Sequence, residues 1–310
     1  MADSVKIAYV FPGQGAQSVG MGRDLYQAFK SAKDVFDSAD ESLGFSLSRL
    51  CFDGPEDELR QTINAQPAIV TASFACLEAC REAGVALPPA DFVAGHSLGE
   101  YTALAAAGVL DFGHTVYLAR ERGRLMHAAG RTNPGAMAAI IGLDGLPLDE
   151  LCAETGTQIA NINSPGQIVI SGPEAGINRA VELAKSKGAH RAIPLQVSGA
   201  FHTPLMQSAV DGMAGIIDTM EFNDPAVPII GNTTARLLTT AKAVKEELLD
   251  QLCNCVRWQE SVENMVAAGV GTFIEIGPGK VLAGLIKRID RSVKIINIGD
   301  AEAVRNFSVD

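Results

Sequence analysis

The sequence of 310 residues has little positive charge, few aromatic side chains and no long apolar run. Lys and Arg number 25 against 36 Asp and Glu, so the formal net charge is −11. This balance argues against a nucleic-acid-binding protein, because phosphate binding needs a basic face. No uncharged apolar stretch approaches the roughly 20 residues of a membrane-spanning helix. With 47% hydrophobic and 20% charged residues, the chain has the composition of an ordinary globular protein.

The six cysteines and five histidines form no metal-binding pattern. Cys76 and Cys80 are one helical turn apart, and Cys253 and Cys255 are too close together for the usual zinc spacing. We interpret the cysteines as small hydrophobic residues in a reducing compartment. We therefore expect neither a metal nor a bound cofactor.

The start of the chain carries no visible targeting signal. Residues 1–4 include an acidic side chain and lead directly into a strand-like segment. We expect a cytoplasmic protein, or one of an organelle matrix if a transit peptide has been removed. The length suggests two structural units, at ~100–200 residues per domain.

Strand-like and helix-like segments alternate along most of the chain, which is typical of an α/β fold with a mainly parallel sheet. The Gln66-Pro67 pair is expected to begin a helix that ends at Gly84, because Pro is favoured in a first helical turn. Between residues 134 and 198 the predicted order becomes β-α-β-β-α-β, the ferredoxin-like order. The sequence thus predicts a large α/β domain from residues 1–133 and 199–310, interrupted by a ferredoxin-like small domain at 134–198.

The segment Gly95-His96-Ser97-Leu98-Gly99 matches G-x-S-x-G between a predicted strand and a predicted helix. The glycines allow a reversal tight enough to expose the serine hydroxyl, and the N–H of Leu98 would point to where an oxyanion forms. A bare match can be a tight turn without chemistry. The strand-turn-helix context favours Ser97 as a nucleophile.

A serine nucleophile needs a base within hydrogen-bond reach. His202 is the preferred candidate, because it lies in a loop where the chain re-enters the large domain. The other four histidines are expected to be surface or turn residues: His96, His114, His127 and His190.

No acidic third partner stands out for the pair. Asp144, Asp149 and Glu174 fall in the predicted small domain, and His202 comes too early for the usual hydrolase order. We therefore expect a dyad whose histidine is oriented by a backbone carbonyl or an amide.

Seven short motifs lie along the chain: FPGQG at 11–15, GHSLGEY at 95–101, Arg122-Gly123, 161–166, Phe201-His202, Gln251 before Trp258, and GPGK at 277–280. Taken together, these motifs resemble the malonyl-CoA:acyl carrier protein transacylase family, over nearly the whole chain. The resemblance implies an α/β-hydrolase-like large domain with an inserted ferredoxin-like domain.

The resemblance implies a ping-pong reaction through a malonyl ester of Ser97, with His202 as the base. The backbone N–H groups of Gln14 and Leu98 would hold the oxyanion, and the backbone carbonyl of Gln251 would orient the histidine. Coenzyme A is then part of a substrate.

The resemblance also implies that Arg122 binds the malonyl carboxylate through a bidentate contact. From the sequence alone it is one of several arginines on a helix. Phe201, Met126 and Asn163 are further implied substrate-binding residues, and the Phe201 ring would crowd an α-methyl branch.

The implied partner is acyl carrier protein, which is acidic in this family, so a local basic patch would have to steer its encounter with the chain. The protein is expected to be monomeric. Three alternatives stay open: a serine hydrolase or thioesterase with the same Ser-His pair, a non-catalytic carrier-binding module, and an acyltransferase of a polyketide pathway. The candidate patch residues are Lys185, Lys187, Arg191, Lys280, Lys287 and Arg288.

Overall fold

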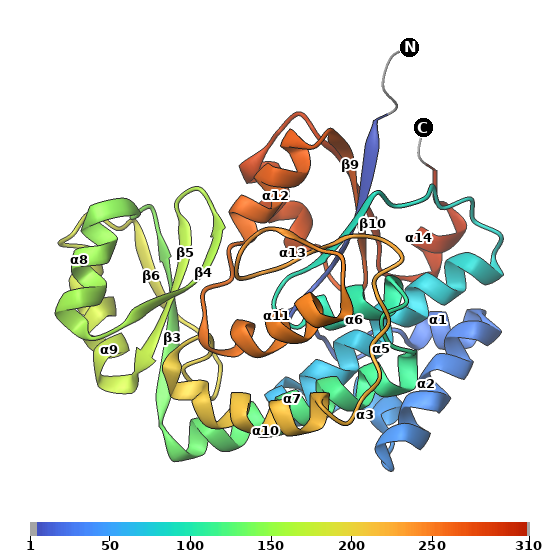
Figure 1. Cartoon of the computed structure of the whole chain (residues 1–310), viewed down its shortest axis with the longest axis horizontal. Coiled ribbons are helices and arrows are strands. Elements are labelled where there is room, and N and C mark those ends of the chain that lie inside the picture. Colours follow the sequence, from blue (N-terminus) through green and yellow to red (C-terminus); the bar gives the residue numbers. More distant parts are fainter. Residues whose placement is uncertain (1–4, 309–310) are drawn as a thin grey trace.

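The computed structural model describes residues 5–308 and contains two β-sheets in separate parts of the molecule (Figure 1). The larger sheet has the strand order β10-β9-β1-β2-β7-β8, and all neighbouring pairs are parallel except β7 with β8. This confirms the predicted α/β class. The strands are β1 (Lys6–Phe11), β2 (Phe92–Gly95), β7 (Ile229–Ile230), β8 (Leu237–Leu238), β9 (Val270–Ile276) and β10 (Lys294–Ile298).

Helices cover both faces of the larger sheet, because its strands are apolar on both sides. In β1, Ala8 and Val10 are buried with Trp258 on one face, whereas Phe11 joins the cluster of the other face with Ile69. The helices of this part are α1 (Arg23–Ala28), α2 (Lys30–Leu43), α3 (Leu47–Asp53), α4 (Glu56–Arg60), α5 (Thr62–Glu82), α6 (Gly99–Ala106), α7 (Phe112–Thr132), α10 (Gln207–Ile217), α11 (Ala241–Cys253), α12 (Trp258–Ala267), α13 (Val281–Ile289), α14 (Ala301–Arg305) and the 3-10 helix Pro204–Met206.

The smaller sheet is antiparallel, with the order β4-β5-β3-β6. Two helices pack on it and form a separate apolar core, in which Ile140, Leu151 and Ile170 are buried. The element order is the predicted β-α-β-β-α-β, while the boundaries at 134 and 198 stay a prediction. The elements are β3 (Gly135–Ile141), α8 (Gly145–Thr155), β4 (Gln158–Ser164), β5 (Gln167–Pro173), α9 (Glu174–Ala184) and β6 (Arg191–Pro194).

A short backbone bridge ties the smaller sheet to the rest of the protein. Val256, just before α12, donates its N–H to Ala160 O at 2.8 Å and accepts from Ile162 N at 2.9 Å. Both partners lie on β4. The bridge therefore fixes the part of β4 that faces the larger sheet.

One predicted helix start is wrong. Helix α5 begins at Thr62, so Pro67 lies inside it rather than in its first turn. Proline has no N–H and leaves the carbonyl four residues earlier without its helical donor. Here that carbonyl, Ile63 O, accepts from Arg120 Nη1 at 2.7 Å. A long-range contact thus compensates for the proline.

Within residues 5–308, no helix is long and apolar enough to cross a membrane. The same residues contain no group of three or more His, Cys, Asp or Glu that could hold a metal ion. The expectation about a targeting signal concerns residues 1–4, which lie outside the described residues.

Candidate active site

Two turns meet at the carboxyl ends of the neighbouring strands β1 and β2. They are packed backbone against backbone: a Cβ on Gly13 would come within 2.3 Å of His96 O, and one on Gly99 within 2.1 Å of Phe11 O. Only glycine fits such an approach. The two glycine turns of the sequence are therefore one structural unit.

Ser97 lies in the second turn with a φ of 50°, in the left-handed region that non-glycine residues rarely adopt. Its backbone is held on both sides. Its N–H donates to Asn232 Oδ1 at 2.7 Å, and its carbonyl accepts from Gln251 Nε2 at 3.0 Å. The strained turn is thus stabilised by side chains from distant parts of the chain.

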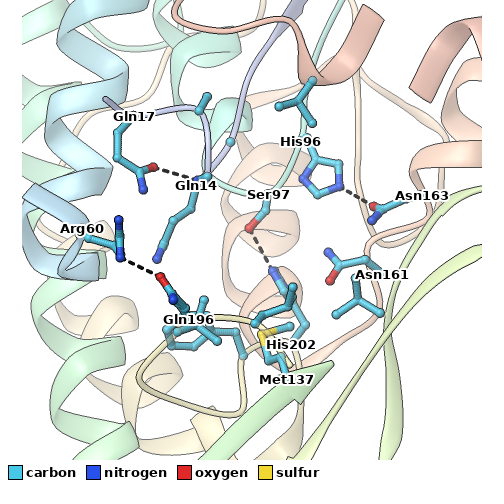
Figure 2. Close-up of a pocket in the computed structure, with 18 of the residues that line it drawn as sticks. Gln14, Gln17, Arg60, His96, Ser97, Met137, Asn161, Asn163, Gln196 and His202 are labelled. Atoms are coloured by element: carbon cyan, nitrogen blue, oxygen red, sulfur yellow. Dashed lines mark hydrogen bonds between the residues drawn. The ribbon is translucent and has the colours of Figure 1, made fainter. Parts of the chain in front are cut away.

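The structure brings Ser97 and His202 together (Figure 2). Ser97 Oγ lies 2.8 Å from His202 Nε2, and His202 Nδ1 lies 2.7 Å from the backbone carbonyl of Gln251. A carbonyl can only accept, so Nδ1 carries the proton and Nε2 accepts from the serine hydroxyl. This is the geometry of a serine with its general base, and a backbone carbonyl stands in the place of the missing acid.

His202 is buried and has a φ of 61°. Burial, together with the neighbouring positive charge of Arg122, lowers the pKa of its imidazole to about 3. The ring is therefore neutral at pH 7, which is the state that can accept a proton from Ser97.

Arg122 is 1% exposed and lies at the same point. It donates to the side-chain oxygens of Gln66 at 2.8 Å and Gln251 at 2.7 Å, and its Nη2 lies 3.2 Å from Ser97 Oγ. Its guanidinium carbon is 5.4 Å from the centre of the Tyr101 ring. Among residues 5–308 no carboxylate forms an ion pair with it. A buried cation without a counter-ion is a site for an anionic group.

The amides predicted for an oxyanion site also lie here. Gln14 follows β1 and Leu98 follows Ser97, and within the described residues neither N–H donates to another group. The Gln14 side chain accepts from Thr62 Oγ1 at 2.9 Å. Both amides are thus available beside the nucleophile.

A cavity of about 570 Å³ opens in front of these groups. One wall comes from the larger sheet and its helices and carries Ser97, Arg122 and His202. The opposite wall, which we call the small-sheet wall, consists of Met137, Asn161, Asn163, Gln167 and Val169. The remaining predicted residues, Phe201 and Met126, also line the cavity.

His96 points away from Ser97, as expected (Figure 2). Its Nε2 is 2.7 Å from Asn163 Oδ1, and its ring packs against Trp258. It therefore links the two walls of the cavity. His114 and His190 are exposed, and His127 is half-buried away from the cavity lining.

The predicted basic residues separate into two groups. Lys187 forms ion pairs with Glu150 and Glu154 on α8. Arg288 on α13 instead contacts Gln167 of the small-sheet wall, and Lys280 precedes Val281 at the cavity.

The sequence reasoning missed two residues, Glu100 and Asn232. Glu100 lies three residues after Ser97, is fully buried, and accepts from Asn232 and Gln251. An acid immediately before the predicted helix was a visible signal. Nothing local indicated its burial or its partners.

Comparison with known proteins identifies the family. The model of the acyl transferase domain family matches residues 8–304. A malonyl CoA-acyl carrier protein transacylase of Bacillus subtilis is 49% identical over 304 residues, which cover 96% of this chain and 95% of that protein.

Solved structures agree with this result. An acyl-carrier-protein-S-malonyltransferase from Bartonella henselae has a TM-score of 0.93 and 42% identity, over 96% of this chain and 97% of that one. A type II PKS acyl-carrier protein in complex with its malonyl-transacylase gives a TM-score of 0.93 and 41% identity over the same shares. The resemblance inferred from the motifs is confirmed.

Proposed function

Because the chain belongs to the acyl transferase domain family, we propose that it transfers the malonyl group of malonyl-CoA to the phosphopantetheine thiol of acyl carrier protein. It is then an [acyl-carrier-protein] S-malonyltransferase that supplies fatty-acid biosynthesis. The reaction proceeds through a covalent enzyme and needs no bound cofactor, since coenzyme A arrives as part of the substrate.

In the first half-reaction, Ser97 Oγ attacks the thioester carbonyl while its proton moves to His202 Nε2. The 2.8 Å separation of these atoms is within proton-transfer reach. The C–S bond then breaks, and the same proton passes to the departing sulfur of coenzyme A. The products are malonyl-Ser97 and free coenzyme A.

The tetrahedral intermediate carries a negative oxygen. The N–H groups of Gln14 and Leu98 are proposed to donate to it, because both are unpaired within the described residues and belong to the two turns that meet at the cavity. The backbone contact between the two glycine turns holds these donors in place before the substrate arrives.

The buried, unpaired guanidinium of Arg122 is the observation that carries the choice of malonyl. It lies 3.2 Å from Ser97 Oγ, so an acyl group on the serine that reaches it must be short and end in an anion. Acetyl leaves the guanidinium without its partner, which costs roughly 1.5–3 kcal/mol for a hydrogen bond to a charged group. Phe201, beside the base, is proposed to disfavour an added α-methyl group.

In the second half-reaction, the phosphopantetheine thiol of the carrier gives its proton to His202 and attacks the ester. Malonyl moves to sulfur, and the serine regains its proton. The carrier is proposed to dock at the cavity mouth next to α13, where Lys280 and Arg288 lie, because the net charge of −11 otherwise repels an acidic partner. The protein acts as a monomer in this proposal.

Intact-mass spectrometry tests the proposal. The protein is mixed with malonyl-CoA, and thiol-bearing carrier protein is then added, with Ser97→Ala as the matched control. We expect a malonyl adduct on Ser97 that moves to the carrier, and no adduct on the variant.

Two other outcomes would overturn the proposal. An adduct lost to water at the same rate with and without carrier identifies a hydrolase or thioesterase. A folded protein that forms no adduct is a binding module. Comparing carriers of fatty-acid and polyketide type identifies the pathway, and the similarity to a malonyl-transacylase of a type II PKS carrier makes that comparison worthwhile.

A further inference from the structure

Glu100 is a fully buried carboxylate in the first turn of α6 that forms no ion pair within residues 5–308. Three N–H donors face it instead. Asn232 donates its backbone N–H at 3.1 Å and its Nδ2 at 3.0 Å to Oε1, and Gln251 Nε2 donates to Oε2. The contacts found for this carboxyl group are all from donors, so both of its oxygens act as acceptors.

The first arm of this network leads to Arg122. Since Gln251 Nε2 faces an acceptor carboxylate, Gln251 Oε1 must point the other way, and it accepts from Arg122 Nη2 at 2.7 Å. An amide flipped by 180° would set two donors against each other at Arg122. Glu100 thus determines which end of the Gln251 amide meets the guanidinium.

The second arm leads to the nucleophile. Asn232 Nδ2 also donates to Gly95 O at 2.8 Å, which leaves Asn232 Oδ1 to accept from Ser97 N. Gln251 Nε2 donates to Ser97 O as well as to Glu100. Both polar groups of the strained Ser97 peptide are therefore held by side chains that Glu100 orients.

The charges around Glu100 set its state. Burial and the negative charge of Glu247 on α11 raise the pKa of its carboxyl well above its usual range, and the donors of Asn232 and Gln251 only partly oppose this rise. The positive charge nearest in the network is Arg122, one amide away. The Gln251 amide links the carboxyl group of Glu100 to the guanidinium and keeps the two groups out of direct contact.

We propose that Glu100 is a positioning residue for substrate selection: by orienting Gln251 it keeps Arg122 open to a substrate carboxylate. A carboxylate in direct contact with Arg122 would occupy the guanidinium and compete with malonyl. This inference rests on the proposed malonyl transfer.

The test uses Glu100→Gln, which keeps the shape but offers one acceptor oxygen where the network needs two. Position 100 would then present a donor to Gln251 Nε2, and the amide of Gln251 would have to turn. We expect malonyl-Ser97 still to form, with kcat/KM for malonyl-CoA lowered about 10²-fold, the loss typical of a misplaced binding group. Acylation by acetyl-CoA, which does not use Arg122, should fall much less. The malonyl-to-acetyl ratio therefore drops.

Glu275→Gln is the matched control. Glu275 is equally buried and accepts from Leu282 N at 3.1 Å, Ala283 N at 2.8 Å and Asn297 Nδ2 at 2.6 Å. The Glu275→Gln variant should be less stable than the wild type but should have the same ratio of malonyl to acetyl acylation rates. Equal losses for both acyl groups in Glu100→Gln would show a merely structural role and overturn the inference.

A double variant, Glu100→Gln with Gln251→Glu, keeps the inference testable if the single variant does not fold. It restores a donor–acceptor pair between the two positions and conserves the net charge, but it places the carboxylate directly on Arg122. We expect a folded protein whose malonyl-to-acetyl ratio of acylation rates lies at least about tenfold below that of the wild type. Wild-type malonyl preference in this variant would overturn the inference. Absence of any acyl-enzyme in the wild type would instead refute the proposed function itself.

Discussion

The two walls of the cavity differ in what they contribute. The wall of the larger sheet carries a hydroxyl that lies within hydrogen-bond distance of both an imidazole and a guanidinium. The small-sheet wall carries amides and apolar side chains, such as Asn163 and Met137. Buried ionisable groups therefore belong to the first wall, whereas the second offers shape and neutral hydrogen bonds. The difference implies that the first wall performs the chemistry and binds the acyl carboxylate, whereas the second shapes the space around the rest of the substrate.

Ser97→Ala is the most severe way to test this division. Without the hydroxyl no ester can form, so covalent malonylation should be abolished. Intact-mass spectrometry with peptide mapping measures it. Labelling that persists on a residue of the small-sheet wall would show that this wall, and not the wall of the larger sheet, supplies the nucleophile.

His202→Ala should slow acylation by roughly 10²–10⁴-fold, the usual cost of losing a general base. The carbonyl of Gln251 would remain but have no imidazole to orient. Stopped-flow release of coenzyme A gives the rate. An unchanged rate would move the role to another histidine.

Arg122→Ala should lower the preference for malonyl over acetyl by roughly 10–100-fold, the equivalent of one charged hydrogen bond. The ratio of the two kcat/KM values measures it. An unaltered ratio would show that Arg122 does not bind the malonyl carboxylate and that the small-sheet wall selects the substrate.

The buried imidazole of His202 should make stability depend on pH. Its pKa is about 3 in the folded protein and near 6.5 when unfolded, so the unfolded chain binds more protons between these values. Stability from this residue is present above pH 6.5 and is lost as the pH falls. From pH 7 to pH 5 the wild type should lose about 2 kcal/mol more than His202→Gln. Urea unfolding of both proteins at the two pH values measures this difference. Equal losses of stability in the wild type and the variant would contradict a neutral buried ring.

Asn163→Ala should have the smallest effect. The variant removes one neutral hydrogen bond, to His96. The loss of such a bond costs about 1 kcal/mol, which corresponds to a roughly fivefold rise in KM for malonyl-CoA with little change in kcat. Steady-state kinetics separate the two constants. A kcat that falls as steeply as KM rises would show that the small-sheet wall takes part in the chemical step.

The sequence alone was sufficient where the signal is local. The Ser97 turn was predictable because strand, glycines and helix follow one another along the chain. Arg122 was not distinguishable from Arg120 and Arg124 without the family resemblance. Only the tertiary structure separates them, since Arg124 pairs with Glu121 at the surface and Arg120 compensates for Pro67 in α5.

Long-range contacts also account for the failures. The start of α5 at Thr62 depends on a donor from α7, and the burial of Glu100 depends on residues 232 and 251. Neither partner is encoded near the residue that it affects. Periodicity and capping rules report only neighbours along the chain.

Ser97 and His202 share one further property, a positive φ on a side-chain-bearing residue. Such backbone typically costs on the order of 1–3 kcal/mol each and persists only while the surroundings enforce it. Any loosening of those surroundings lets both residues relax, well before the sheets separate. Catalysis should therefore vanish at lower urea concentrations than circular dichroism changes, and turnover is the more sensitive measure of whether a preparation or an engineered variant is natively folded.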